Sequence, residues 1–357
     1  MIVKHERPGV YSSYEASTVV LSRGGQKVVG AVGQSALGTA GKVVRVTSVE
    51  QAAAEFGANS GGVCLVELVR LALLNGAAAV AAVAAAVGAE PTEAEYAAAF
   101  AKLETEDHVE LVVCGSSELA VQQALRESVK AASDGRRERI AVVGSDGENV
   151  NELVERAKAL NSERVVLTAP NAVAGDGSGT LSGVAVAAAV AGAIAAENDP
   201  AVPLGGAVVR GFGGLDAMYS DNELDTLIRG GVTPLECVGG ELSVVRGITT
   251  RTKTGESEDA TWRELTTILI VDDVIPTIRN SLRAKFSRSK NTVQTRGAVR
   301  SQVILDLEAK LAGEIITGYD EVMVSVGETQ PSVCLVDFGF TVAHGLNQIH
   351  LTAHITI

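Results

Sequence analysis

Hydrophobic and polar residues alternate in the last part of the chain. From residue 349 onward every second residue is apolar, with histidine or threonine between; the apolar positions are Ile349, Leu351, Ala353, Ile355 and Ile357. A period of two is typical of a β-strand with one buried face. Residues 333–342 repeat the alternation, and residues 343–347 predict the turn between the two strands. The last strand either completes a sheet of its own chain or offers its edge to a neighbouring chain.

The middle of the chain alternates between apolar runs and helical patterns. The predicted strands cover residues 78–83, 109–114, 139–143 and 164–168, and the predicted helices cover residues 92–103, 117–132, 149–160 and 180–196. Continuously apolar strands, each followed by a helix, indicate a sheet that is covered on both faces. The pattern therefore predicts an α/β fold with a mostly parallel, doubly wound sheet.

The segments before and after this region predict other arrangements of helices and strands. Before it we expect an extended arm over residues 1–16, strands at 18–21, 28–32 and 43–46, and helices at 48–56 and 62–74. After it we expect a helix at 222–228, a hairpin at 232–238 and 242–248, helices at 262–286 and 296–311, and strands at 321–326 and 333–342. Ser48 followed by Gln51 has the spacing of a capping box. Pro276 is expected to kink or end its helix.

Composition narrows the class of protein. The chain has 357 residues, 46% of them apolar and 20% charged, which is enough for two or three domains with a sizeable core. Aromatic residues make up only 3%, so strong association would depend on main-chain pairing, aliphatic burial and charge. The net charge of −13 argues against general nucleic-acid binding. We expect no signal peptide and no membrane insertion, because the apolar runs of about 13 residues are too short to span a bilayer.

The cysteines and histidines do not form a recognisable metal site. Cys64, Cys114, Cys237 and Cys334 are far apart in apolar runs, which predicts buried thiols in a reducing compartment. His350 and His354 share a strand face but stand ~13 Å apart, too far to bind one metal ion. No catalytic, cofactor-binding or metal-binding residue is predicted.

One glycine-rich loop has the character of an enzyme site. Residues 175–179 read Gly-Asp-Gly-Ser-Gly between a predicted strand and a predicted helix, where phosphates often bind. The spacing is not GxGxxG, and no Walker lysine follows. A flexible connection explains the loop equally well. The chain also lacks the GxSxG motif of serine hydrolases.

A run of positive charge interrupts this acidic chain. Residues 279–300 contain no Asp or Glu and include Arg279, Arg283, Lys285, Arg288, Lys290, Arg296 and Arg300. The run is either a solvated helix end, where cations favour the helix dipole, or a docking surface for an acidic protein.

Three short motifs in fixed order resemble those of a known family. They are Arg-Pro-Gly-Val-Tyr at residues 7–11, Pro-Ala-Val-Pro-Leu at 200–204 and Asn-Ser-Leu-Arg-Ala-Lys-Phe at 280–286. With the chain length, they resemble the contractile tail sheath proteins of myophages and R-type bacteriocins. The resemblance implies a subtilisin-like α/β core without a catalytic triad. It also implies an α+β C-terminal domain and exchanged N- and C-terminal arm strands.

The resemblance divides the chain and implies a role for each part. It implies an N-terminal arm over residues 1–20, a core over 21–245, a C-terminal domain over 246–342 and an arm strand over 343–357. The arm residues exchanged between subunits would be Pro8, Gly9, Val10 and Tyr11, with Ile349, Leu351, Ala353, Ile355 and Ile357. A tube-facing basic patch would consist of Arg279, Arg283, Lys285, Arg288 and Lys290.

The function implied is structural and non-enzymatic, without a cofactor. Subunits would stack as hexameric rings around an inner tail tube and contract to drive the tube into a target cell. Partners would be other copies of the chain, the tail tube protein, and baseplate and tail terminator proteins. The particle would be a phage tail or a bacteriocin assembled in the cytoplasm of the bacterial host. The alternative is a small-molecule or nucleotide-binding α/β enzyme that uses residues 175–179.

Overall fold

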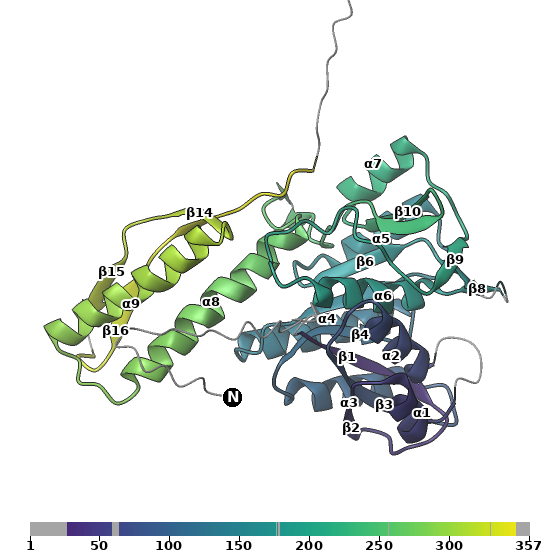
Figure 1. Cartoon of the computed structure of the whole chain (residues 1–357), viewed down its shortest axis with the longest axis horizontal. Helices are drawn as coiled ribbons and strands as arrows, with labels where there is room; N and C mark the ends of the chain where they lie inside the picture. The colour runs from purple at the N-terminus through teal and green to yellow at the C-terminus, as the bar shows by residue number, and fades with distance from the viewer. Residues whose placement is uncertain are drawn as a thin grey trace, which may run out of the picture.

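The computed structural model describes residues 27–58, 64–175, 177, 179–255, 257–328 and 330–347. These residues form two bodies side by side (Figure 1). One is an α/β body built around a large sheet. The other is a smaller body made of two long helices and four short strands.

The α/β body is organised by an eight-stranded sheet with the order β11-β10-β6-β5-β4-β1-β3-β2. Neighbouring strands are parallel from β10 to β3, and the edge strands β11 and β2 are antiparallel to their neighbours. The strands are β1 (Val28–Ser35), β2 (Val43–Val46), β3 (Ala79–Val87), β4 (Val109–Cys114), β5 (Ile140–Gly144), β6 (Val165–Ala169), β10 (Thr233–Val238) and β11 (Glu241–Val244). The prediction of a mixed α/β fold with a mostly parallel sheet is confirmed.

Helices cover both faces of this sheet, which is why its strands are apolar on both sides. One face packs against α1 (Val49–Phe56), α2 (Leu65–Leu74) and α6 (Gly183–Ala196), and the other against α3 (Glu93–Glu104), α4 (Leu119–Asp134), α5 (Val150–Leu160) and α7 (Asp221–Arg229). Helix α6 is buried almost all round, consistent with its Ala-rich sequence. A Cβ at Gly192 would lie 2.4 Å from the Ala72 carbonyl oxygen, so α2 and α6 can pack this closely only with glycine there.

Polar side chains cap several helices at the positions that the sequence indicates. The Ser48 hydroxyl accepts a hydrogen bond of 3.2 Å from the Gln51 amide. Thr92 and Glu95 form a reciprocal capping box at the start of α3. The amide and hydroxyl of Thr92 donate to the Glu95 carboxylate, and these bonds lower the pKa of that group.

The second body consists of α8 (Leu265–Phe286) and α9 (Val293–Ala312), followed by β14 (Ile316–Tyr319), β15 (Met323–Val326), β16 (Cys334–Asp337) and β17 (Phe340–Val342). Strand β14 pairs with β17, and β15 pairs with β16. Its core includes Ile270 and Val274 of α8, Val303 and Leu307 of α9, and Ile316 of β14. Within the described ranges no helix has the length and apolarity to cross a bilayer.

Two predicted elements differ from the structure. The helix predicted over residues 180–196 begins only at Gly183, because Thr180 and Leu181 pair with β7 (Ala172–Ala174) as the short strand β8 (Thr180–Leu181). The strand predicted over residues 333–342 is divided into β16 and β17, since Phe338 and Gly339 leave the β-ladder between two different partner strands.

Two further expectations also need correction. Helix α8 does not end at Pro276, because Val274 and Ile278 on either side are both buried in the same core and hold the helix continuous. Cys114 is buried as predicted, and burial raises the pKa of its thiol to about 11, but Cys334 is exposed on β16. The division at residues 20, 245 and 342 remains a prediction.

Candidate functional site

The predicted arm residues lie outside the described part of the chain. These are Pro8, Gly9, Val10, Tyr11, Ile349, Leu351, Ala353, Ile355 and Ile357. The structure does describe the positions from which the two end segments leave. Lys27, at the start of β1, lines an apolar cavity of about 280 Å³ beside the 200–207 loop. A Cβ at Gly345 would lie 2.8 Å from Pro203 of that loop, so Lys27 and Gly345 lie beside the same loop.

The short strands of the second body have edges to which no other described strand is paired. Among the described residues, β14 pairs only with β17 and β15 only with β16, so each strand keeps one side without a strand partner. Met323 of β15 and Leu335 of β16 are 58% and 50% exposed. Open backbone groups beside exposed apolar side chains are a template for pairing with another strand.

Some cations of the basic run contact other residues of the chain, and others do not. Arg279 forms an ion pair of 2.7 Å with Glu138 of the α/β body. Lys285 donates to Gln302 of α9 over 2.5 Å, and Arg300 donates to the Val322 carbonyl over 2.7 Å. Arg296 donates to the Asn291 side chain over 3.0 Å, so these four cations form contacts within the chain.

Of the remaining cations, Arg288 and Lys290 lie in the turn between α8 and α9, and Arg283 lies in the last part of α8, where it also lines a groove between this helix and the α/β body. Arg283, Arg288 and Lys290 are exposed and have no ion pair or hydrogen-bond partner among the described residues. This turn is at the end of the second body farthest from the α/β body (Figure 1). Of the predicted patch, these three side chains are therefore available to a partner.

Ion pairs join the two bodies across a polar groove. Arg164, just before β6, donates two hydrogen bonds of 2.7 and 3.0 Å to the Asp272 carboxylate of α8. Both side chains are only 14% exposed. The groove has a volume of about 670 Å³ and lies at the amino ends of β4 and β5. Helix α8 is therefore held to the α/β body by directional charged contacts as well as by apolar packing.

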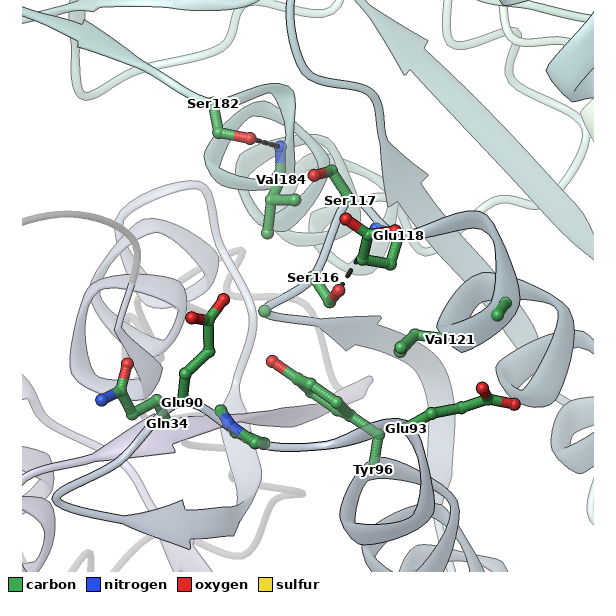
Figure 2. A pocket seen from close by; sticks show the side chains of 13 residues that line it. Gln34, Glu90, Glu93, Tyr96, Ser116, Ser117, Glu118, Val121, Ser182 and Val184 are labelled. Carbon is green, nitrogen blue, oxygen red and sulfur yellow. Dashed lines mark hydrogen bonds between the residues drawn. The ribbon is translucent and has the colours of Figure 1, made fainter.

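A second depression lies at the opposite, carboxyl ends of the strands. Strand β1 lies between β3 and β4 in the sheet. After β1 the chain forms β2 and β3 on one side and then β4 on the other side, so the direction in which strands are added reverses between β1 and β4. Ligands of doubly wound proteins bind at this switch point. Here a crevice of about 400 Å³ is lined by Gln34, Glu90, Pro91, Glu93, Tyr96, Gly115, Ser116, Ser117, Glu118, Ala120, Val121, Ser182 and Val184 (Figure 2).

The crevice does not have the chemistry of a nucleotide site. Its lining contains three glutamates and neither lysine nor arginine. The first amides of α6 are already bonded within the chain, since the Gly183 amide donates to the Asn171 side chain over 2.7 Å and the Val184 amide to the Ser182 hydroxyl over 3.4 Å. A phosphate would meet repulsion from carboxylates and few open donors.

The glycine loop is not part of the crevice. Gly175, Gly177 and Gly179 belong to the connection between β7 and β8, and Gly177 has a φ of +70°, as tight turns of this kind require. The loop is therefore the tip of a hairpin and not the start of a helix. No cluster of His, Cys, Asp and Glu suited to a metal ion occurs within the described ranges.

Sequence reasoning did not find the crevice or the Arg164–Asp272 pair. The crevice depends on which strands are neighbours, and the β–α alternation alone does not determine this order. The ion pair joins residues 108 positions apart. The adjacent Asp272 and Asp273 in an otherwise apolar stretch of α8 were the available signal.

Comparison with known proteins identifies two matching domains. A family model for the phage tail sheath protein central domain matches residues 89–250, and a model for the phage tail sheath C-terminal domain matches residues 257–356. The tail sheath protein of Bacillus phage SP01 is 29% identical over 248 residues, and that of Mycobacterium phage Bxz1 is 29% identical over 296 residues. The matches cover 68% and 78% of this chain but 42% and 49% of those relatives, so the chain spans about half of their length.

Solved structures show the same fold. The sheath tail protein from Desulfitobacterium hafniense has a TM-score of 0.70 at 13% identity, over 94% of this chain and 100% of that one. The anti-feeding prophage helical sheath in its contracted state has a TM-score of 0.71 at 18% identity, over 99% of both chains.

Proposed function

This chain belongs to the contractile tail sheath family, and from that premise we propose that it is a structural subunit of a contractile sheath. Subunits would polymerise as stacked hexameric rings around an inner tail tube, and contraction would drive the tube into a target cell. The observation that carries the proposal is the pair of two-stranded sheets in the second body, whose strands have open edges. No catalytic step is required, because the energy is stored in contacts between subunits.

The open edges are suited to receive the predicted arms of neighbouring copies. A strand at residues 349–357 would add main-chain hydrogen bonds of about 0.5–1.5 kcal/mol each, besides burying its apolar face. Met323 and Leu335 would then be covered by a neighbour's apolar side chains. A contact between two different surfaces repeats without closing, and this produces an extended polymer.

The arms and the ion pairs between the two bodies have different roles in this proposal. The arms link copies, while the Arg164–Asp272 and Arg279–Glu138 pairs keep each subunit rigid. Rigid subunits connected by extended segments can rotate past one another without losing their links. An extended lattice held by such links can be kinetically trapped and then relax irreversibly.

Further partners follow from the position of a sheath in a particle. We propose that the exposed cations Arg283, Arg288 and Lys290 face an acidic tube protein, and that the polymer ends contact baseplate and tail terminator proteins. The particle would be a phage tail or bacteriocin assembled in the cytoplasm of the bacterial host.

Electron microscopy of the purified full chain in negative stain tests the function. We expect rods or polysheaths of uniform width, because the open strand edges and the arms are self-complementary between copies. Monomers that persist at every protein and salt concentration would contradict the proposal.

Reversing the exposed cations should weaken assembly on the tube. For Arg283→Glu/Arg288→Glu we expect polymerisation on added tube protein to fall at least about tenfold, as lost charged contacts are worth about 1.5–3 kcal/mol each. Polymerisation without tube should stay within about twofold. Sedimentation with and without tube measures both.

The matched control is Lys42→Glu/Lys102→Glu, which reverses two exposed cations of the α/β body. It should leave tube-templated assembly unchanged. An equal effect of both double variants, or an equal loss with and without tube, would remove the tube-facing assignment.

A further inference from the structure

The crevice between the carboxyl ends of β1 and β4 contains a polar group that the fold leaves without a partner. Tyr96 of α3 is only 3% exposed, and its ring packs 6.0 Å from that of Phe100, centroid to centroid. Its hydroxyl points into the crevice (Figure 2) and would lie 3.4 Å from a Cβ at Gly115. Among the described residues this hydroxyl forms no hydrogen bond. Because it lines an open crevice, this hydroxyl is available to form a hydrogen bond with a ligand.

The charges around this hydroxyl are all negative. Glu90 extends toward the Tyr96 hydroxyl and Ser116, whereas Glu93 points the other way (Figure 2). Glu118 also lines the crevice, and neither Glu90 nor Glu118 has an ion-pair partner among the described residues. Burial, with the nearby Cys114 and Glu90, raises the pKa of the Tyr96 phenol, so the hydroxyl remains neutral near pH 7.

The positive ends of the adjoining helices are already compensated. The Glu118 amide at the start of α4 bonds to the Ser116 hydroxyl over 3.2 Å, and Glu95 caps the start of α3. The remaining groups without a side-chain hydrogen bond among the described residues include the carboxylates of Glu90 and Glu118, the hydroxyls of Tyr96 and Ser117, and the Gln34 amide, all of which can accept hydrogen bonds. An anion would be repelled, while a ligand with N–H donors and a positive charge would satisfy them.

We propose that this crevice binds an organic cation, an alkylammonium or guanidinium group, with Glu90 and Glu118 as counter-charges and the Tyr96 hydroxyl as an acceptor. The cation is either a free polyamine-like molecule or a lysine or arginine side chain of another protein chain. The assignment rests on the crevice alone and does not depend on the sheath function.

Agmatine, which carries both cationic groups, is the probe. Isothermal titration calorimetry with the full chain should show saturable binding that weakens as salt is added. Glu90→Gln should weaken binding about tenfold or more, since a charge-assisted contact is lost. Tyr96→Phe, which keeps the packed ring, should weaken it about threefold to tenfold. ADP should not bind.

Glu55→Gln on α1 is the matched control, because it removes the same charge from an exposed side chain outside the crevice. It should change agmatine affinity less than about twofold. Absence of agmatine binding at millimolar concentration would overturn the proposal, as would equal weakening by Glu90→Gln and Glu55→Gln. Binding of ADP in place of agmatine would show that the crevice binds anions and not cations, and this would also overturn the proposal.

Competition with assembly separates the two sources. If a side chain of another copy occupies the crevice, agmatine should inhibit polymerisation of the unmodified chain but not of Tyr96→Phe. If the ligand is a free molecule, agmatine should bind without altering polymerisation. Either result supports the cation site. A chain that binds agmatine and never polymerises would contradict the sheath proposal alone.

Discussion

Deletion of residues 349–357 is expected to give a folded subunit that no longer polymerises. The helices and strands of both bodies end at or before Val342, so we expect the shortened chain to keep them. What it removes is the strand that would occupy the open edges of β14–β17 and β15–β16 in a neighbouring copy. Each lost strand bond is worth only about 0.5–1.5 kcal/mol, but a polymer loses several at every contact. Circular dichroism should be unchanged while sedimentation and microscopy show monomers.

Two point variants make the test sharper, since they keep the length of the chain. Leu351→Asp/Ile355→Asp places charges on the predicted apolar face of the strand and should prevent polymerisation as deletion does. Thr352→Asp/Thr356→Asp adds the same charges to the polar face and should leave assembly largely intact. Rods formed by the truncated chain would show that the strand is not donated between copies.

Breaking the buried ion pair between the bodies is expected to cause the largest loss of stability from one substitution. Asp272→Asn leaves the Arg164 guanidinium in a site that is 14% exposed, without its counter-charge. Removing one partner of a buried pair costs about 3–5 kcal/mol. The single tryptophan, Trp262, packs partly against the α/β core close to the start of α8, so its fluorescence in urea should follow the change.

Comparison with an exposed pair isolates the effect of burial. Lys130 and Asp134 form an ion pair of 2.9 Å with side chains 62% and 70% exposed, and Asp134→Asn should lower stability much less than Asp272→Asn because water already solvates both charges. The double variant Arg164→Met/Asp272→Leu should recover much of the stability, because it leaves no unpaired charge. If Asp272→Asn and Asp134→Asn lowered the free energy of unfolding by the same small amount, the charge of Asp272 beside Arg164 would not contribute to stability.

Local patterns predicted elements wherever one period held over a whole segment. The continuously apolar runs at β4, β5 and β6 predicted buried parallel strands, and Ser48 marked the start of its helix because capping depends on neighbours a few residues away. The prediction was wrong at Thr180, where an Ala-rich run preceded by glycines is compatible with both a helix and a hairpin. Pairing with Val173 decides in favour of the strand there.

The sequence by itself determined the alternating α/β class, the positions of most helices and the family membership that its short motifs indicated, because these depend on periodicity and on residue identity. Only the tertiary structure decided the strand order, the crevice beside Tyr96, the pairing of Arg164 with Asp272 and the division of the basic run into bound and available cations. Each of these joins residues far apart in the chain. Burial and distance between such residues arise only when the helices and strands pack together.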